Sequence, residues 1–195
     1  MIYRIHEDDR YLGFSFDADD IIDKLGRKYP IHIKRAPISY SEVWPESLRV
    51  EFKPWETYSK DIVPDVSLGN GRLFLNEKAY DALKDVLNDY GEFLAVHHDK
   101  GEGYVFNPLV TAESVNGVDD KQTVHDKHGN LESYAFIEES VKDIAIFRTE
   151  LDVYLSVYCN QVFKDTFEKA GLIGISFNKD VSNALIEMYG VEFPE

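Results

Sequence analysis

The sequence is poor in cysteine and in long apolar runs, and both shortages limit where the protein works. Cys159 is the single cysteine among 195 residues, so no intramolecular disulfide can form and a reducing compartment is indicated. No run approaches the roughly 20 apolar residues of a membrane-spanning helix. The first ten residues, MIYRIHEDDR, lack the apolar region behind a basic head that marks a signal peptide. We therefore expect a cytoplasmic protein with no membrane segment.

Signature motifs of catalysis are also missing. The chain has no Gly-rich phosphate loop, nucleophile elbow, kinase signature or Cys/His zinc spacing. The candidates for a metal site are His97, His98, His125 and His128, with Asp99 and Asp126 beside them. Both histidine pairs flank predicted turns, and neighbouring residues on a strand point to opposite faces, so we expect solvent-facing turn residues and no metal, cofactor or catalytic site. The 36 acidic residues leave a carboxylate-based hydrolase open.

Basic residues are scarce relative to acidic ones, and unevenly so. The net charge is -15, from 21 basic and 36 acidic side chains. Residues 1–60 hold 11 acidic and 10 basic residues (net -1), whereas residues 61–195 hold 25 and 11 (net -14). A surface of this sign repels nucleic acid and anionic membranes, and it attracts a basic protein partner. The alternative is that the charge serves only solubility.

The first third of the chain predicts a strand, a helix and a long irregular segment. The strand is expected at residues 11–16, and the helix begins after the N-cap Asp17 and stops at Gly26. Residues 29–58 contain both tryptophans and four prolines, which favour loops and short extended pieces: Pro30, Pro37, Pro45 and Pro54.

In the remainder, pairs of predicted strands alternate with helices. Strands are expected at 71–75, 92–99, 104–112, 121–126, 131–138, 143–148, 153–158 and 172–177, with hairpin turns at 100–103 and 127–130. Helices are expected at 77–90, 161–170 and 181–190, the first two capped by Asn76 and Asn160. This order predicts an α+β fold with a largely antiparallel sheet and several short helices. We expect one domain over residues 1–195, and a Pro/Gly-rich join leaves open a small N-terminal lobe at 1–65 beside a core at 66–195.

Four acidic residues recur at helical spacing on the helix after Asn76. They are Glu77, Asp81, Asp85 and Asp89, and we call them the acidic ridge. Each i, i+4 pair of like charges costs roughly 0.2–0.5 kcal/mol in an isolated helix, although Lys78 and Lys84 offset part of that cost through i, i+3 spacing. The acidic ridge is our candidate partner-binding site, and an ordinary solvated helix face is the alternative.

Three segments carry a resemblance to a known family. They read LFLNEKAYDALKDVLNDYGEFLAV, GYVFNPLVTAESVN and IFRTELDVYLSVYCNQVFKDTFEKAGLIGISF, and they lie within residues 73–177. Over this range the chain resembles immunity protein family eleven of bacterial polymorphic toxin systems. The family pattern is interrupted after the YVFNPL strand, where this chain has TAESVNGVDDKQT from Thr111 onward. The matching positions are mostly apolar residues and glycines that form the fold, so the resemblance supports the fold more than a mechanism.

What the resemblance implies is a cytoplasmic, non-catalytic immunity protein. Such a protein binds a cognate protein toxin and neutralises it, and the family supplies no catalytic residue to carry over. The acidic charge of this chain leaves open that the toxin is basic. Two other readings stay open on the residues alone. One is a small acidic enzyme that reverses a toxin's modification, and the other is an adaptor or chaperone for a secreted protein.

Overall fold

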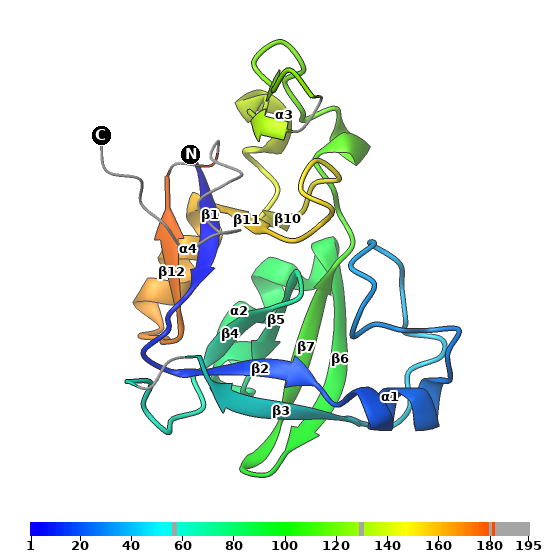
Figure 1. Cartoon of the computed structure of the whole chain (residues 1–195). Helices are drawn as coiled ribbons and strands as arrows, with labels where there is room; N and C mark the ends of the chain where they lie inside the picture. Colours follow the sequence, from blue (N-terminus) through cyan, green and yellow to red (C-terminus); the bar gives the residue numbers. More distant parts are fainter. Residues whose placement is uncertain (56–57, 129–130, 180, 182–195) are drawn as a thin grey trace.

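The computed structural model describes residues 1–55, 58–128, 131–179 and 181 (Figure 1). The larger sheet has the strand order β2 (Leu12–Phe16), β3 (Leu48–Pro54), β6 (Gly91–His98), β7 (Gly101–Pro108), β5 (Arg72–Leu75) and β4 (Val66–Gly69). The smaller sheet has the order β10 (Ile146–Phe147), β11 (Val157–Asn160), β1 (Ile2–Glu7) and β12 (Ile175–Asn178). Two further short strands, β8 (Val124–His125) and β9 (Leu131–Ser133), pair with each other. Neighbouring strands in these sheets are antiparallel except β3 and β6, which are parallel.

Short helices connect these strands. They are α1 (Ala18–Leu25), α2 (Glu77–Leu87), α3 (Glu138–Val141) and α4 (Gln161–Lys169), with 3-10 turns η1 (Asn88–Tyr90) and η2 (Glu113–Val115). The predicted N-caps are confirmed, because side chains accept hydrogen bonds from the first turns of three helices: Asp17 on α1, Asn76 on α2 and Asn160 on α4. The predicted α+β fold with a largely antiparallel sheet and several short helices is therefore confirmed.

Strands from the first 65 residues pair with later strands in both sheets. β1 lies between β11 and β12, and β3 pairs with β6. β1 was missing from the sequence prediction, since its place depends on partners more than 150 residues away. The division into a lobe at 1–65 and a core at 66–195 stays a prediction.

Several predicted boundaries are wrong. The hairpin turn expected at 100–103 is Asp99–Lys100, because β7 already begins at Gly101, which pairs with His98. The predicted helix at 77–90 ends as α-helix at Leu87 and continues as η1. The predicted strands at 121–126 and 131–138 shrink to β8 and β9, because the aromatic residues after β9 pack into a cluster with Phe147 and Tyr158. The predicted helix at 181–190 lies, apart from Val181, outside the described residues.

The predicted strand at 153–158 is wrong in its first half. Val153 and Tyr154 have left-handed backbone angles, with φ of 57° and 58°, and β11 begins only at Val157. The cause is Asp152, whose carboxylate accepts hydrogen bonds from the backbone N–H groups of Leu155 (3.2 Å) and Ser156 (3.0 Å) and so closes a turn. Val153 was expected to point inward as part of an alternating strand, but it is 66% exposed.

The core occupies both faces of the larger sheet, as the alternation of side chains along a strand requires. On one face the sheet packs against α2, α4 and the smaller sheet, with buried residues such as Leu75, Leu83 and Phe163. On the other face Phe74, Leu94 and Val96 pack against α1 and the irregular segment 26–47. The larger sheet therefore has α2 and α4 on one side, and α1 with the loop-rich segment on the other.

Two fully buried arginines fasten that irregular segment to the sheet. Arg72 and Arg148 are both 0% exposed. The guanidinium of Arg72 donates to the carbonyl of Lys34 (3.0 Å) and to Asn107 Oδ1 (3.0 Å), and that of Arg148 donates to the carbonyl of Arg35 (2.6 Å). Burial lowers the pKa of Arg72 to about 10 and of Arg148 to about 9, so both stay protonated at neutral pH. The middle of the segment is thus held by charge-assisted hydrogen bonds to the backbone carbonyls of Lys34 and Arg35.

Replacing Arg72 with methionine should lower the free energy of unfolding by about 3 kcal/mol or more, because buried carbonyls lose their charged donor. Urea unfolding followed by circular dichroism measures the change. Arg49→Met is the control, since its partly exposed guanidinium makes surface ion pairs, and it should cost less than about 1 kcal/mol. Equal effects of the two substitutions would contradict the anchoring role of Arg72.

Glycine at position 153 should stabilise the protein by about 1 kcal/mol, because Val153 adopts a left-handed conformation that glycine reaches without steric cost. Thermal unfolding of Val153→Gly should show a higher Tm. The matched control is Val162→Gly in α4, which is 57% exposed and should destabilise by about 0.5 kcal/mol. A lower Tm for Val153→Gly would contradict the left-handed turn.

Candidate functional site

The acidic ridge lies on the solvent-facing side of α2 and its 3-10 extension. Glu77, Asp81 and Asp85 belong to α2 and Asp89 to η1, and all four side chains are exposed. The opposite face of the helix packs into the core through Ala79, Leu83 and Leu87. The predicted ridge residues therefore share one exposed surface, and their role in binding stays a prediction.

The two lysines near the acidic ridge behave differently. Lys84 forms the expected i, i+3 ion pair with Asp81 (2.7 Å). Lys78 was expected to act in the same way, but its ammonium instead contacts Asp65 (3.1 Å) and donates to the carbonyl of Gly171 (2.9 Å). The reason is the loop before β4, which places Asp65 beside the start of α2. Less of the ridge charge is neutralised than the sequence indicates.

A groove of about 860 Å³ lies beside the start of α2, and we call it the β6–β7 groove. The hairpin contributes Ala95, His97, Glu102 and Tyr104 to its lining. The segment Pro45–Ser47 and Lys24 of α1 line it as well, as does Glu77, the first residue of the acidic ridge. The groove and the ridge therefore meet at Glu77 and form one continuous surface.

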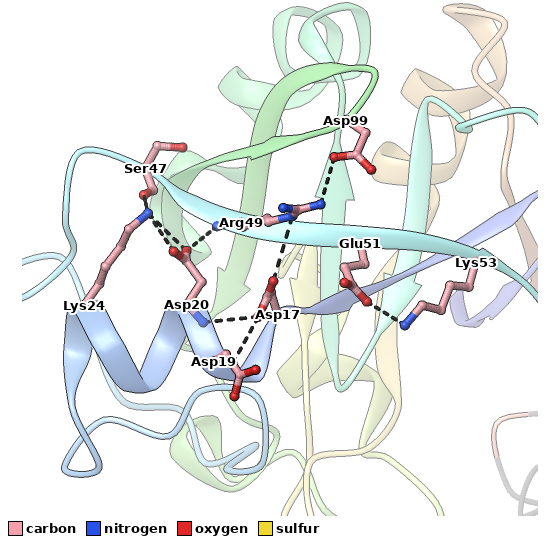
Figure 2. Close-up of polar contacts among 9 residues, drawn as sticks. All are labelled: Asp17, Asp19, Asp20, Lys24, Ser47, Arg49, Glu51, Lys53 and Asp99. Carbon is pink, nitrogen blue, oxygen red and sulfur yellow. Dashed lines mark hydrogen bonds and ion pairs between the residues drawn. The ribbon is translucent and has the colours of Figure 1, made fainter.

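Figure 2 shows the polar contacts that hold α1 against β3 at this groove. The carboxylate of Asp20 contacts the Lys24 ammonium (2.9 Å) and accepts a hydrogen bond from the backbone N–H of Arg49 (2.7 Å). The Lys24 ammonium also donates to the carbonyl of Ser47 (3.1 Å). At the far end, the Arg49 guanidinium bridges Asp17 (3.8 Å) and Asp99 (2.9 Å). Both the helix and the hairpin turn are thereby tied to one strand.

The charge of the groove is negative. Three glutamates line it, Glu46, Glu77 and Glu102, and all are exposed. Within the described ranges none of them has an ion pair or a side-chain hydrogen bond. The Lys24 ammonium is occupied by Asp20 and the Ser47 carbonyl. The carboxylates of the groove are therefore available to a cation from outside the molecule.

An aromatic pair stands at the same place. Tyr104 lines the groove and stacks on Tyr80 of α2, with ring centroids 4.1 Å apart and planes inclined by 22°. Tyr80 also contacts the edge of Phe93 (5.0 Å). Stacking fixes the position of the Tyr104 ring, so a ligand in the groove meets an aromatic surface that needs little reordering.

The histidines divide as strand geometry requires. His97 Nδ1 lies 2.9 Å from Ser47 Oγ in the groove, whereas His98 packs on the other face against Phe52 (4.9 Å) and Phe74 (5.6 Å). Burial lowers the pKa of His98. The expectation that both are solvent-facing turn residues is wrong, because the turn consists of Asp99 and Lys100 and both histidines are half-buried in β6. In the second hairpin, His125 and His128 are exposed.

Across the part of the chain that the structure describes, no three His, Cys, Asp or Glu side chains are grouped as metal ligands. Over the same residues, no helix has both the length and the apolar character needed to span a membrane. Comparisons of the chain with protein-family models and with curated proteins found no match.

Sequence reasoning named Glu77 and His97 but missed the rest of the groove. Glu46 and Glu102 are 56 positions apart and meet only because β3 pairs in parallel with β6, which brings the segment before β3 alongside the hairpin. Nothing in the local pattern around Glu46 indicates this. The one available signal was Tyr104, an aromatic residue beside a predicted turn.

Asp20→Asn should lower the free energy of unfolding by about 1–2 kcal/mol at pH 7, because Asp20 accepts charge-assisted hydrogen bonds. Burial alone would raise the pKa of Asp20, but the Arg49 N–H and the Lys24 ammonium together lower it below its ordinary value. The stabilisation is therefore present above about pH 4 and is lost as pH falls through the folded pKa. Urea unfolding at pH 7 and pH 3 should show the deficit shrinking.

Asp19→Asn is the control for this measurement, since Asp19 is exposed in the same helical turn (Figure 2). It should change stability little at pH 7. A deficit for Asp20→Asn that is as large at pH 3 as at pH 7 would show that its carboxylate charge is not the stabilising feature.

Proposed function

We propose that this chain is a non-catalytic immunity protein that binds and neutralises a cognate bacterial protein toxin in the cytoplasm. The observation that carries the proposal is the continuity of the acidic ridge with the β6–β7 groove through Glu77. This surface offers a line of exposed carboxylates that ends in a groove with a fixed aromatic ring. A basic protein surface is its natural complement.

The charge of the chain supports a partner of this kind. Arg4, Arg72 and Arg148 are buried, whereas no aspartate or glutamate among the described residues belongs to the buried class. The exposed surface is therefore more acidic than the net charge of -15 suggests. A surface of one sign accelerates encounter with an oppositely charged protein, and stacked aromatic residues contribute to affinity after contact.

The resemblance to immunity protein family eleven supplies the biological setting. The segments that carry it include α2, the β6–β7 hairpin and α4 with β12. The acidic ridge and the hairpin of the groove thus lie inside the resembling range, whereas Lys24 and Pro45–Ser47 come from the first 60 residues. In this proposal the first part of the chain completes a binding surface that the later part begins.

Co-expression with the product of the adjacent large open reading frame tests the proposal, with bacterial growth and co-purification scored together. Restored growth with a stable complex is the expected result. Restored growth without a complex would favour an enzyme that reverses the toxin's modification. A complex without restored growth would favour an adaptor or chaperone, and the absence of both would contradict the proposal.

Reversing the charge of the acidic ridge should weaken the complex. In the variant Glu77→Lys, Asp81→Lys, Asp85→Lys and Asp89→Lys, the association rate should fall at least about tenfold at low salt, because electrostatic steering is lost. Surface plasmon resonance at two ionic strengths measures it, and the wild-type rate should itself fall with salt.

The matched control reverses four exposed carboxylates elsewhere, and so changes the net charge equally. Its substitutions are Asp19→Lys, Asp120→Lys, Glu132→Lys and Glu150→Lys. This control should retain most of the wild-type association rate. Equal losses in the two variants would show that only net charge matters and that the acidic ridge is not a binding surface.

A further inference from the structure

We propose that the β6–β7 groove receives an arginine side chain from the partner protein. This inference rests on the proposed function, because it assumes a protein partner with a basic surface, and it names the group that the partner contributes. The volume of about 860 Å³ lies within the range of roughly 300–1,000 Å³ that is typical of pockets for small ligands. There is room for one long side chain and the backbone beside it.

Strand pairing occupies part of the hairpin at the groove. β3 pairs with β6 at Val96 and His97, and β5 pairs with β7 from Tyr104 to Phe106. These stretches of the hairpin have no free edge for a peptide backbone. The groove therefore favours recognition through side chains that enter it.

Charge complementarity selects a cation. Glu46, Glu77 and Glu102 reach the groove from three separate segments, and each lacks an ion-pair partner among the described residues. Lys24, the lysine of the lining, is already neutralised by Asp20 at 2.9 Å. An anionic ligand would meet three carboxylates and no available ammonium group. A cationic side chain gains an electrostatic partner from each segment.

The aromatic pair favours arginine over lysine. Tyr104 lines the groove, and its ring is stacked on that of Tyr80. The Lys84 ammonium already lies 5.4 Å from the centre of the Tyr80 ring, so this stack accepts a cation within the protein itself. A guanidinium is planar, so it stacks on a ring and simultaneously donates two parallel hydrogen bonds to a carboxylate. An ammonium group has neither property.

The apolar part of the lining suits the stem of such a side chain. Pro45, Ala95 and Gly103 line the groove together with the three glutamates. The three methylene groups of arginine can lie along this surface while the guanidinium reaches the acidic groups. His97 is held by Ser47 at one wall, so the imidazole is positioned and does not fill the groove freely.

Nuclear magnetic resonance titration of the full chain with Nα-acetyl-arginine amide tests the inference without requiring the toxin. We expect saturable shifts of the backbone amides of Ala95, His97 and Gly103. The citrulline analogue has the same shape without the charge, and it should produce no saturable shift. Nα-acetyl-lysine amide should bind at least about twofold more weakly, because it cannot stack and bridge at once.

Substitutions in the groove test where the arginine compound binds. Glu102→Gln and Glu77→Gln should each raise the Kd of the arginine compound about twofold to fivefold, which is the range of one exposed ion pair. The control Glu132→Gln removes an exposed charge of β9 outside the groove lining and should leave the Kd unchanged. Equal binding of citrulline, or shifts confined to the α2 surface, would overturn the inference.

The experiments distinguish failure of the immunity function from failure of the arginine site. Restored growth and a stable complex without arginine binding would leave the immunity function standing and remove the groove from it. Arginine binding in the groove without restored growth would retain the site and contradict the immunity function.

Discussion

The interaction on which the rest of the structure depends is the contact of two buried guanidinium groups with backbone carbonyls of an irregular segment. Arg72 begins β5 and Arg148 follows β10, so each is fixed by a sheet. Both donate to the same acceptor, Asn107 Oδ1, at 3.0 and 3.4 Å. Asn107 in turn donates to Glu92 Oε1 (2.7 Å), which accepts the backbone N–H of Tyr40 (2.9 Å). Segment 26–47 owes its position to this network, because it contributes no strand to the described sheets.

This arrangement places like charges close together in the interior. The positive charge of Arg72 contributes to the lowered pKa of Arg148, after burial itself. No carboxylate pairs directly with either guanidinium in the described residues, so the carbonyl groups and Asn107 carry the compensation. Such a network is specific, since few other arrangements satisfy so many donors, but it is not complete, because Arg148 Nε is buried without a hydrogen-bond partner among the described residues. It also removes positive charge from the surface, which links the packing of the core to the acidity of the exterior.

The sequence predicted correctly those features that depend on contacts between residues close together in the chain. Asp17, Asn76 and Asn160 were recognisable as N-caps because a cap bonds within three residues of itself. β1 escaped prediction because its neighbours are β11 and β12, and Val153 was misassigned because one carboxylate, Asp152, redirects the chain. In the candidate site, too, one part could be predicted from local sequence and the other could not. The acidic ridge follows from helical periodicity alone, whereas the β6–β7 groove depends on the parallel pairing of β3 with β6, for which the sequence holds no local signal.

The two parts of the surface act over different distances, and this explains why both are needed in the proposed function. The carboxylates of the acidic ridge are exposed to solvent, so their attraction is long-ranged, weak for each pair and reduced by salt. The groove acts only on contact, because its carboxylates and the Tyr104 ring face one bounded volume. Glu77 belongs to both, so under the proposed function a basic partner guided along α2 would arrive at the groove without leaving the acidic surface. In that proposal, attraction by the ridge raises the rate of encounter, and the shape and chemistry of the groove decide which basic partner stays bound.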